Sequence, residues 1–230
     1  MLQSATISAS ASASASPSHP QWFSDFPPFI ALSRDRKFLC SNPRNLHAMA
    51  KARKIAVVGS RSVGKSSMTV RFVEDHFVES YYPTIENQFS KTIEFKNQEY
   101  AIEILDTAGQ DEFSMMSEKH LIGVHGYLLV YSVTSRQSFE MVEVIRDKIL
   151  NAIGNDNIPL VLVGNKSDLE YQRQVDHADG VKLAERFGCP FMESSVKENI
   201  NVNSVFETLI DRVESVQNPK SKPEEKCVIM

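Results

Sequence analysis

The chain has 230 residues, of which 42% are hydrophobic and 23% charged, and its formal net charge is −4. This composition is that of a globular protein and excludes collagen-like and wholly disordered chains, while no apolar run approaches the ~18–20 residues of a membrane-spanning helix. The net charge gives no indication of binding to nucleic acid, and the three cysteines are too few and too scattered for a disulfide scaffold.

The two ends of the chain differ in charge from its middle. Residues 51–217 carry a net charge of −7, whereas residues 1–50 carry +2 and residues 218–230 carry +1. Residues 1–50 begin with alternating Ser and Ala, which predicts a disordered low-complexity extension. Two alternatives stay open for this segment: a faint similarity to a transit peptide, and a gene-model artefact with Met49 as the real start.

Strand patterns begin after this extension. The β-branched run over 54–58 predicts a strand, and the residues that follow its glycine-containing loop predict a helix over 65–75. Alternating residues over 88–95 and 100–105 predict two strands joined as a hairpin at 96–99.

Buried strands and amphipathic helices then alternate. Near-continuous apolar runs over 126–133 and 158–163 predict strands that are buried on both faces. Apolar residues recur at helical spacing between these two strands and again near the C-terminus. They are Phe139, Val142, Ile145 and Ile149 in the first case, and Val202, Val205, Phe206, Leu209, Ile210 and Val213 in the second. This alternation predicts one doubly wound α/β domain over residues 51–217.

A phosphate-binding loop follows the first predicted strand. Residues 59–66 read Gly-Ser-Arg-Ser-Val-Gly-Lys-Ser and match the pattern G-x-x-x-x-G-K-[ST]. The glycines allow backbone N–H groups to approach phosphate oxygens, and the helix that begins here adds its positive end. Lys65 would reach the β- and γ-phosphates, and the Ser66 hydroxyl would bind Mg²⁺.

A base-recognition motif follows the apolar run that ends at Gly164. Asn165-Lys166-Ser167-Asp168 lies where a parallel strand ends, which is where open α/β sheets bind ligands. A carboxylate there accepts hydrogen bonds from N1–H and the 2-amino group of guanine, whereas adenine offers neither donor on that edge. Asp168 is therefore predicted to select guanine.

A third motif ends the strand predicted over 100–105. In Asp106-Thr-Ala-Gly109-Gln110, the carboxylate of Asp106 would hold Mg²⁺ through water. Gly109 would donate its N–H to a γ-phosphate, and Gln110 would orient the attacking water.

Together with Pro83-Thr-Ile-Glu86 and Ser195-Val196-Lys197, these motifs resemble those of the Ras superfamily of small GTPases over residues 54–217. The finer similarity is to the Rheb family, whose members activate the TOR kinase complex. Its signs are Arg61-Ser62 in the phosphate loop, the sequences over 83–87 and 131–135, and the short C-terminal tail. The resemblance implies a six-stranded, mostly parallel sheet with one antiparallel strand and about five flanking helices.

The resemblance also implies roles for individual residues. Residues 76–88 would form switch I, in which Thr84 contacts Mg²⁺ and the γ-phosphate only in the GTP state, and 109–122 would form switch II. The implied catalytic residues are Gln110, Thr84 and Gly109, and the implied metal-binding residues are Ser66, Thr84 and Asp106. The implied GTP- and GDP-binding residues are Gly59, Ser62, Val63, Gly64, Lys65, Ser66, Ser67, Phe77, Tyr81, Pro83, Thr84, Gly109, Asn165, Lys166, Asp168, Ser195, Val196 and Lys197.

Three departures from the Ras pattern qualify these roles. Arg61-Ser62 replaces the usual glycines and implies slow hydrolysis with less dependence on Gln110. Tyr82 replaces an Asp at switch I, and Val196 replaces an Ala. The preferred function is a monomeric GTPase switch whose partners are a TOR-type effector and a GTPase-activating protein. Two alternatives stay open: a Ras- or Rap-like switch with other effectors, and a GTP-bound scaffold with poor hydrolysis.

The C-terminus carries a lipidation signal. Residues 218–230 are polar and contain two prolines, which predicts a tail, and the chain ends in Cys227-Val-Ile-Met230. This fits the pattern C-a-a-X with Met at X, which predicts farnesylation of Cys227 by a prenyltransferase. One lipid chain anchors a protein weakly, so we expect reversible association with the cytoplasmic face of endomembranes and a cytosolic pool.

Overall fold

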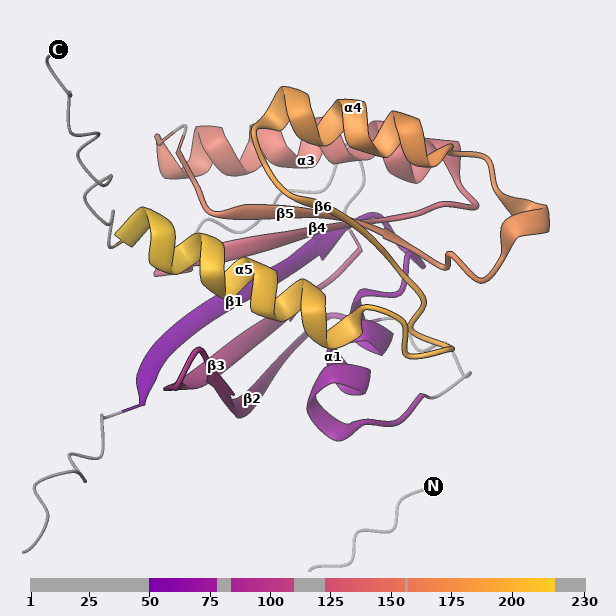
Figure 1. Ribbon diagram of the computed structural model, residues 1–230. Helices are drawn as coiled ribbons and strands as arrows, with labels where there is room; N and C mark the ends of the chain where they lie inside the picture. Colours follow the sequence, from indigo (N-terminus) through magenta and orange to yellow (C-terminus); the bar gives the residue numbers. More distant parts are fainter. Residues whose placement is uncertain (1–49, 78–83, 110–122, 156, 218–230) are drawn as a thin grey trace, which may run out of the picture. The chain divides into compact units, whose positions relative to one another are not determined.

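The computed structural model describes residues 50–77, 84–109, 123–155 and 157–217, and the account below concerns these residues. They form one six-stranded sheet with the strand order β2-β3-β1-β4-β5-β6 (Figure 1). The strands are β1 (Lys51–Gly59), β2 (Glu86–Phe95), β3 (Gln98–Thr107), β4 (Gly126–Ser132), β5 (Leu160–Asn165) and β6 (Phe191–Ser194). Only β2 and β3 pair antiparallel, which confirms the predicted sheet.

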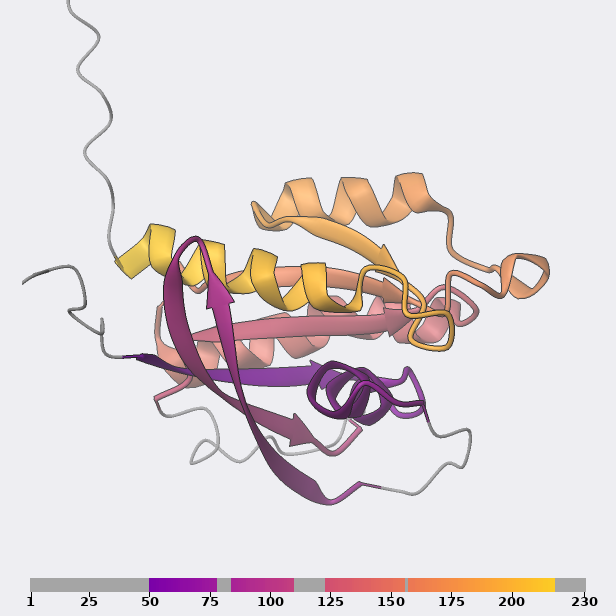
Figure 2. The same ribbon diagram turned by 60° about the horizontal axis from the view of Figure 1, so that its bottom comes forward.

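The helices cover both faces of the sheet (Figures 1 and 2). They are α1 (Lys65–Glu74), α3 (Arg136–Ile153), α4 (His177–Phe187) and α5 (Val202–Gln217), and a 3-10 turn spans Glu170–Gln172. The resemblance implied about five helices, and the described residues contain four. Residues 110–122 of the predicted switch II (109–122) lie outside the described residues. None of the helices described is long and apolar enough to cross a membrane.

Side-chain alternation along the strands divides the core into two layers. Ile55, Val57, Leu128 and Val130 face α1 and α5, and the rings of Phe72 and Phe206 stack there at 3.9 Å between centroids. The neighbouring strand residues, such as Ala56, Val58 and Leu129, face α3 and α4. Both faces of β4 and β5 are therefore buried, as their continuous apolar runs predicted.

Several element boundaries differ from the sequence-based expectation. Strand β1 begins at Lys51 and not at Lys54, because residues 51–54 pair in parallel with Tyr100–Glu103 of β3. Strand β5 begins at Leu160 and not at Ile158, and it runs on to Asn165. The resemblance implied the number of strands and helices, but the residue patterns did not locate α4 and β6: α4 buries only Gly180, Leu183 and Ala184, and β6 has four residues.

Candidate functional site

The three sequence motifs meet at one edge of the sheet. The phosphate loop follows β1, Asp106 lies near the end of β3, and Asn165 is the last residue of β5. The carboxyl ends of parallel strands share an edge, so the motifs converge although up to 109 residues separate them.

The backbone of the phosphate loop requires glycine at two positions. Gly59 has φ 151° and Gly64 has φ 99°, and a Cβ at Gly59 would lie 2.1 Å from the carbonyl oxygen of Val130. A Cβ at Gly64 would lie 2.3 Å from Nδ2 of Asn165. Ser62 also has a left-handed backbone, with φ 60°. Turns of this kind direct successive N–H groups into a concavity that binds anions.

Lys65 is buried at the first turn of α1, and its side chain is turned back along the loop. Its Nζ donates hydrogen bonds to the carbonyl oxygens of Gly59 at 3.0 Å and Ser60 at 2.9 Å. Burial lowers the pKa of Lys65 to about 8, although the nearby carboxylate of Asp106 acts in the opposite direction. The ammonium is therefore held at the centre of the loop by weak acceptors that phosphate oxygens could replace.

Three oxygen-bearing side chains lie beside this lysine and fit a hard divalent cation. The hydroxyls of Ser66 and Thr84 are 2.8 Å apart although 18 residues separate them. Asp106 is fully buried, and neither of its carboxylate oxygens accepts a hydrogen bond from the described part of the chain. Burial raises the pKa of Asp106, while the hydroxyl of Ser66 and the charge of Lys65 lower it. A buried carboxylate without a partner beside two hydroxyls suits the oxygen ligands of Mg²⁺.

The start of the predicted switch II lies against the phosphate loop. A Cβ added to Gly109 would lie 2.3 Å from Cγ and 2.6 Å from Cα of Arg61. Gly109 is therefore required by a close approach of two backbones, and Arg61 is the residue that it approaches.

The base-recognition motif is tied to two other loops. Nδ2 of Asn165 donates to the carbonyl oxygen of Val63 at 2.8 Å, and Nζ of Lys166 donates to that of Ser62 at 2.8 Å. The hydroxyl of Ser195 donates to Oδ1 of Asp168 at 2.6 Å. Burial lowers the pKa of Lys166, an effect that the charge of Asp168 opposes. Asp168 is thus oriented by Ser195 through Oδ1, and its other carboxylate oxygen is available to a base edge.

The structure describes some of the remaining predicted site residues and not others. Val63 and Val196 are buried, and Ser67 lies half-buried on α1. Lys197 is exposed, and Phe77 packs against the core layer of α1 and α5, so their contacts with a nucleotide stay predictions. Four predicted residues lie outside the described residues: Tyr81, Pro83, Gln110 and Cys227.

Two buried hydroxyl groups support the site and were not anticipated. The hydroxyl of Thr107 donates to the carbonyl oxygen of Val57 at 2.8 Å, which links the ends of β3 and β1. The hydroxyl of Ser194 donates to Oδ1 of Asn165 at 3.3 Å, which fixes the orientation of that amide. Both residues stand next to a predicted site residue in sequence, and this position is the only signal that could have revealed them.

Comparison with known proteins agrees with this geometry. The model of the Ras family matches residues 54–215. The chain belongs to the Ras family. This Ras-family chain is 60% identical to the small monomeric GTPase RhbA of Aspergillus fumigatus over 186 residues, which are 80% of the chain and 99% of RhbA. It is 57% identical to the GTP-binding protein rhb1 of Schizosaccharomyces pombe over 79% of the chain and 99% of that protein. Identity to the human GTP-binding protein Rheb is 48%, over 79% of the chain and 98% of Rheb.

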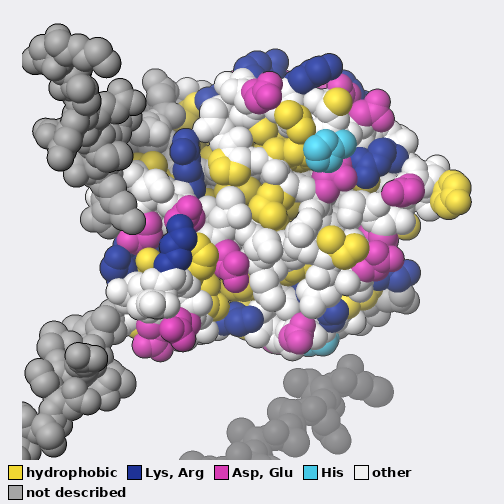
Figure 3. Space-filling view, in the orientation of Figure 1, with side chains coloured by type: hydrophobic (Ala, Val, Ile, Leu, Met, Phe, Trp, Pro, Cys, Tyr) yellow, Lys and Arg dark blue, Asp and Glu magenta, His cyan; other side chains and the backbone are white. Residues whose placement is uncertain are grey.

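The family assignment accounts for the arrangement of the motifs. The described residues form a Ras-like G domain, and the similar proteins are small GTPases of the Rheb type. Basic and acidic side chains are intermixed on the face of this Ras-family chain that Figure 3 shows. The predicted resemblance to the Ras superfamily, with its finer similarity to Rheb, is confirmed.

Proposed function

We propose that this chain is a molecular switch that binds GTP with Mg²⁺, hydrolyses it slowly to GDP and phosphate, and activates the TOR growth-signalling pathway while GTP is bound. The observation that carries the proposal is the convergence of Lys65, the Ser66–Thr84 hydroxyl pair and the unpartnered carboxylate of Asp106 at the edge that also holds Asp168. The names of the similar proteins, which describe GTP binding and GTPase activity, support it.

The residues divide the tasks of binding. Asp168 would accept from the guanine edge, and the backbone N–H groups of the loop over 59–66 would hold the α- and β-phosphates. Lys65 would exchange the carbonyls of Gly59 and Ser60 for β- and γ-phosphate oxygens. Mg²⁺, held by Ser66 and Thr84 with Asp106 behind them, would neutralise charge on the β- and γ-phosphate oxygens.

Hydrolysis would be an in-line displacement. The oxygen of a water forms a bond to the γ-phosphorus while the bond from that phosphorus to the β–γ bridging oxygen breaks, and GDP keeps the electron pair. The proton of the water passes to the released phosphate. Gly109 would donate its N–H to the γ-phosphate, and Gln110 would orient the water. Because Arg61 occupies the approach to Gly109, we expect the intrinsic rate to be low.

The switch would operate through two segments that both sense the γ-phosphate. Thr84 precedes β2 and Gly109 follows β3, so loss of the γ-phosphate removes a contact from each. Ile85, beside Thr84, is 90% exposed and is available to an effector. Overall similarity to Rheb proteins favours a TOR-type effector over Ras- or Rap-type effectors.

Attachment to membranes would come from Cys227. Its thiolate sulfur would form a thioether with C1 of farnesyl diphosphate, diphosphate would leave with the electron pair, and the thiol proton would be lost to solvent. The lysines and glutamates at 220–226 nearly balance, so the tail lacks a polybasic second signal. One lipid chain then gives reversible association, which fits the cytoplasmic face of endomembranes in exchange with the cytosol.

A single-turnover assay tests the central proposal. The purified chain is loaded with GTP and Mg²⁺, and bound nucleotide is followed by chromatography. Slow conversion to GDP supports the switch, whereas intact GTP over the same period favours the hydrolysis-poor scaffold that the contact of Arg61 with Gly109 suggests. Lys65→Met serves as the binding-deficient control and the exposed Lys182→Met as its matched control. Retention of GTP by Lys65→Met would contradict the role assigned to Lys65.

A further inference from the structure

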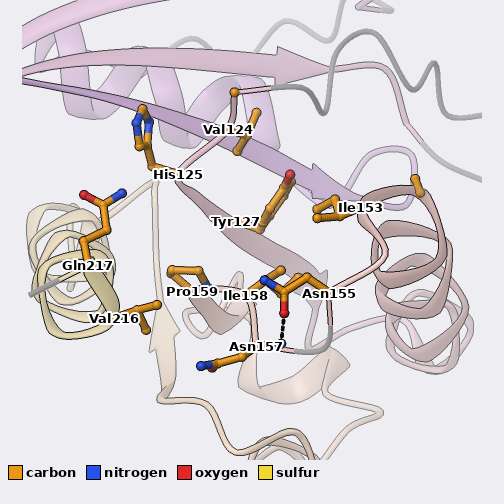
Figure 4. A pocket seen from close by; sticks show the side chains of 12 residues that line it. Val124, His125, Tyr127, Ile153, Asn155, Asn157, Ile158, Pro159, Val216 and Gln217 are labelled. Carbon is orange, nitrogen blue, oxygen red and sulfur yellow. Dashed lines mark hydrogen bonds between the residues drawn. The ribbon is translucent and has the colours of Figure 1, made fainter. Parts of the chain in front are cut away.

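A cavity of about 430 Å³ lies at the edge of the sheet opposite the nucleotide site. It is formed where β4 and β5 begin and where α3 and α5 end, and Figure 4 shows the side chains that point into it. Cavities of ~300–1,000 Å³ hold small organic ligands. Its apolar wall consists of Val124, Tyr127, Ile153, Ile158, Pro159 and Val216.

Among the described residues that line this cavity, none is an Asp, Glu, Lys or Arg. His125 is the one titratable imidazole among them, and its Nδ1 accepts a hydrogen bond from the backbone N–H of Lys54 at 2.9 Å. Burial and the charge of Arg53 lower the pKa of His125, against opposing effects of the bond to Lys54 and the charge of Glu103, which favours the neutral ring. The described lining therefore offers no ion pair to a phosphate or an acidic peptide, and its apolar wall suits a hydrocarbon.

The rim of the cavity is also the point at which the C-terminal tail begins. Val216 and Gln217 line it, and Gln217 is the last described residue (Figure 4). Nine residues, 218–226, separate Gln217 from Cys227. Ten residue steps span at most ~33–36 Å, and a short linker of this kind gives an effective concentration in the millimolar range. A lipid on Cys227 is therefore tethered at the mouth of a cavity whose described apolar wall suits it.

We propose that this cavity binds the isoprenoid chain carried by Cys227 of the same molecule, and so withdraws it from water and from membranes. The proposal rests on the lipidation put forward in the preceding subsection. Burial of the methylene groups of the lipid is favourable whether it takes place in a bilayer or in a protein cavity. The cavity therefore competes with the membrane for one ligand. The cavity and the phosphate loop lie at opposite edges of the sheet, so docking leaves the nucleotide site open.

The test uses the full chain, farnesylated with purified farnesyltransferase and farnesyl diphosphate and checked by mass spectrometry. The first readout is the amide NMR spectrum of the farnesylated chain against the unmodified chain. We expect shifts at cavity residues such as Gly123 and Asn155, unchanged on dilution. The second readout is co-sedimentation with phosphatidylcholine vesicles. If the lipid is docked in about two-thirds of the molecules, opening the cavity raises vesicle affinity ~3-fold.

Two side chains on α3 give a matched pair of variants. Ile153 lines the cavity and Val144 does not, and both are 37% exposed, so a glutamate at either position faces solvent in the folded protein. Ile153→Glu should abolish the farnesyl-dependent shifts and raise vesicle binding, whereas Val144→Glu should leave both as in the parent chain. Val216→Glu, on the opposite wall, should repeat the effect of Ile153→Glu.

The possible failures point to different causes. Farnesylated chain without shifts at the cavity, or with equal vesicle binding in both α3 variants, overturns the docking proposal alone. Shifts that vanish on dilution place the lipid in a second copy of the chain and also overturn it. If mass spectrometry finds no farnesyl group on Cys227, the lipidation and the docking both fail. The switch function is judged separately from the GTP hydrolysis of the same samples.

Discussion

Asn165 at the end of β5 donates a hydrogen bond from Nδ2 to the carbonyl oxygen of Val63 at 2.8 Å, and its side chain is 2% exposed. This bond connects the base-recognition motif to the phosphate loop across 102 residues of sequence. The same nitrogen fills the space in which a side chain at Gly64 would lie. Asn165 therefore shapes the phosphate loop without needing to touch a nucleotide.

Replacing this asparagine should loosen the phosphate loop. In Asn165→Ala the buried carbonyl of Val63 loses its partner, so we expect the free energy of unfolding to fall by ~1–3 kcal/mol. GDP should also dissociate faster, because the loop is less well fixed. Chemical denaturation and release of a fluorescent GDP analogue measure the two effects, with the exposed Asn151→Ala on α3 as control. Equal GDP release from both variants would argue against the positioning role.

The carboxylate of Asp168 should decide which base is bound. Asp168→Asn presents an amide where guanine needs two acceptors, so we expect a loss of GTP affinity by ~10²-fold or more and a new preference for xanthine nucleotides. Competition binding with GTP and XTP measures both, and Asp176→Asn at the start of α4 is the control. Unchanged GTP affinity would remove Asp168 as the base reader.

Thr84 should matter for one nucleotide state only. Its hydroxyl lies 2.8 Å from that of Ser66, and the proposed switch uses it with GTP but not with GDP. In Thr84→Ala the Mg²⁺ concentration needed to retain GTP should rise ~10-fold, while that needed to retain GDP should stay the same. Ser66→Ala should raise both. A variant at Thr84 that weakens Mg²⁺ equally in the two states would contradict the role in switching.

An ion-pair cluster away from the site predicts how stability depends on pH. Glu214 on α5 accepts hydrogen bonds from Lys51 at 2.9 Å and from Nε of Arg53 at 2.9 Å. Burial alone would raise the pKa of Glu214, but these two partners outweigh burial and lower it. A carboxyl whose pKa is lower in the folded chain stabilises the fold above its unfolded pKa, and that stabilisation is lost as the pH falls through the folded pKa.

The variant Glu214→Gln isolates this contribution. At pH 7 we expect it to lower the free energy of unfolding by ~1–2 kcal/mol, and the difference from the parent chain should shrink below about pH 4. Urea denaturation over a pH series measures it, with the exposed Glu185→Gln on α4 as control. A difference that persists unchanged at pH 3 would show that packing, and not charge, accounts for the effect.

Local patterns predicted the α/β class and most of the strands, whereas the six-stranded sheet was implied by the resemblance to the Ras superfamily. Continuous apolar runs marked β4 and β5, and helical spacing marked α3 and α5. The sequence did not locate α4, a short helix in which only Gly180, Leu183 and Ala184 are buried, so that one large apolar residue alone marks its inner face. It also missed β6, which is short and only partly buried. Its pairing with β5, and not local propensity, defines β6.

The site shows the same division between local and distant information. The identities of Lys65, Asp106 and Asp168 followed from their motifs. The motifs did not predict the bond from Ser194 to Asn165 or the approach of Arg61 to Gly109. The first pair is 29 positions apart in sequence and the second pair 48. Residues 81–83 and 110 lie outside the described residues, so the predicted roles of Tyr81, Pro83 and Gln110 stay predictions.

The register of the β2–β3 hairpin brings two segments close enough for one partner to contact both. Glu86 of β2 pairs with Thr107 of β3. Thr84 lies two residues before Glu86, and Gly109 lies two residues after Thr107. The two proposed γ-phosphate sensors therefore lie at the same end of one ladder, where paired backbones are ~5 Å apart. A single small surface on a partner can therefore contact the segments of Thr84 and Gly109 at the same time. A partner that contacts both segments would bind tightly only when both have their GTP-state conformations. It would bind weakly to a molecule in which only one segment has changed.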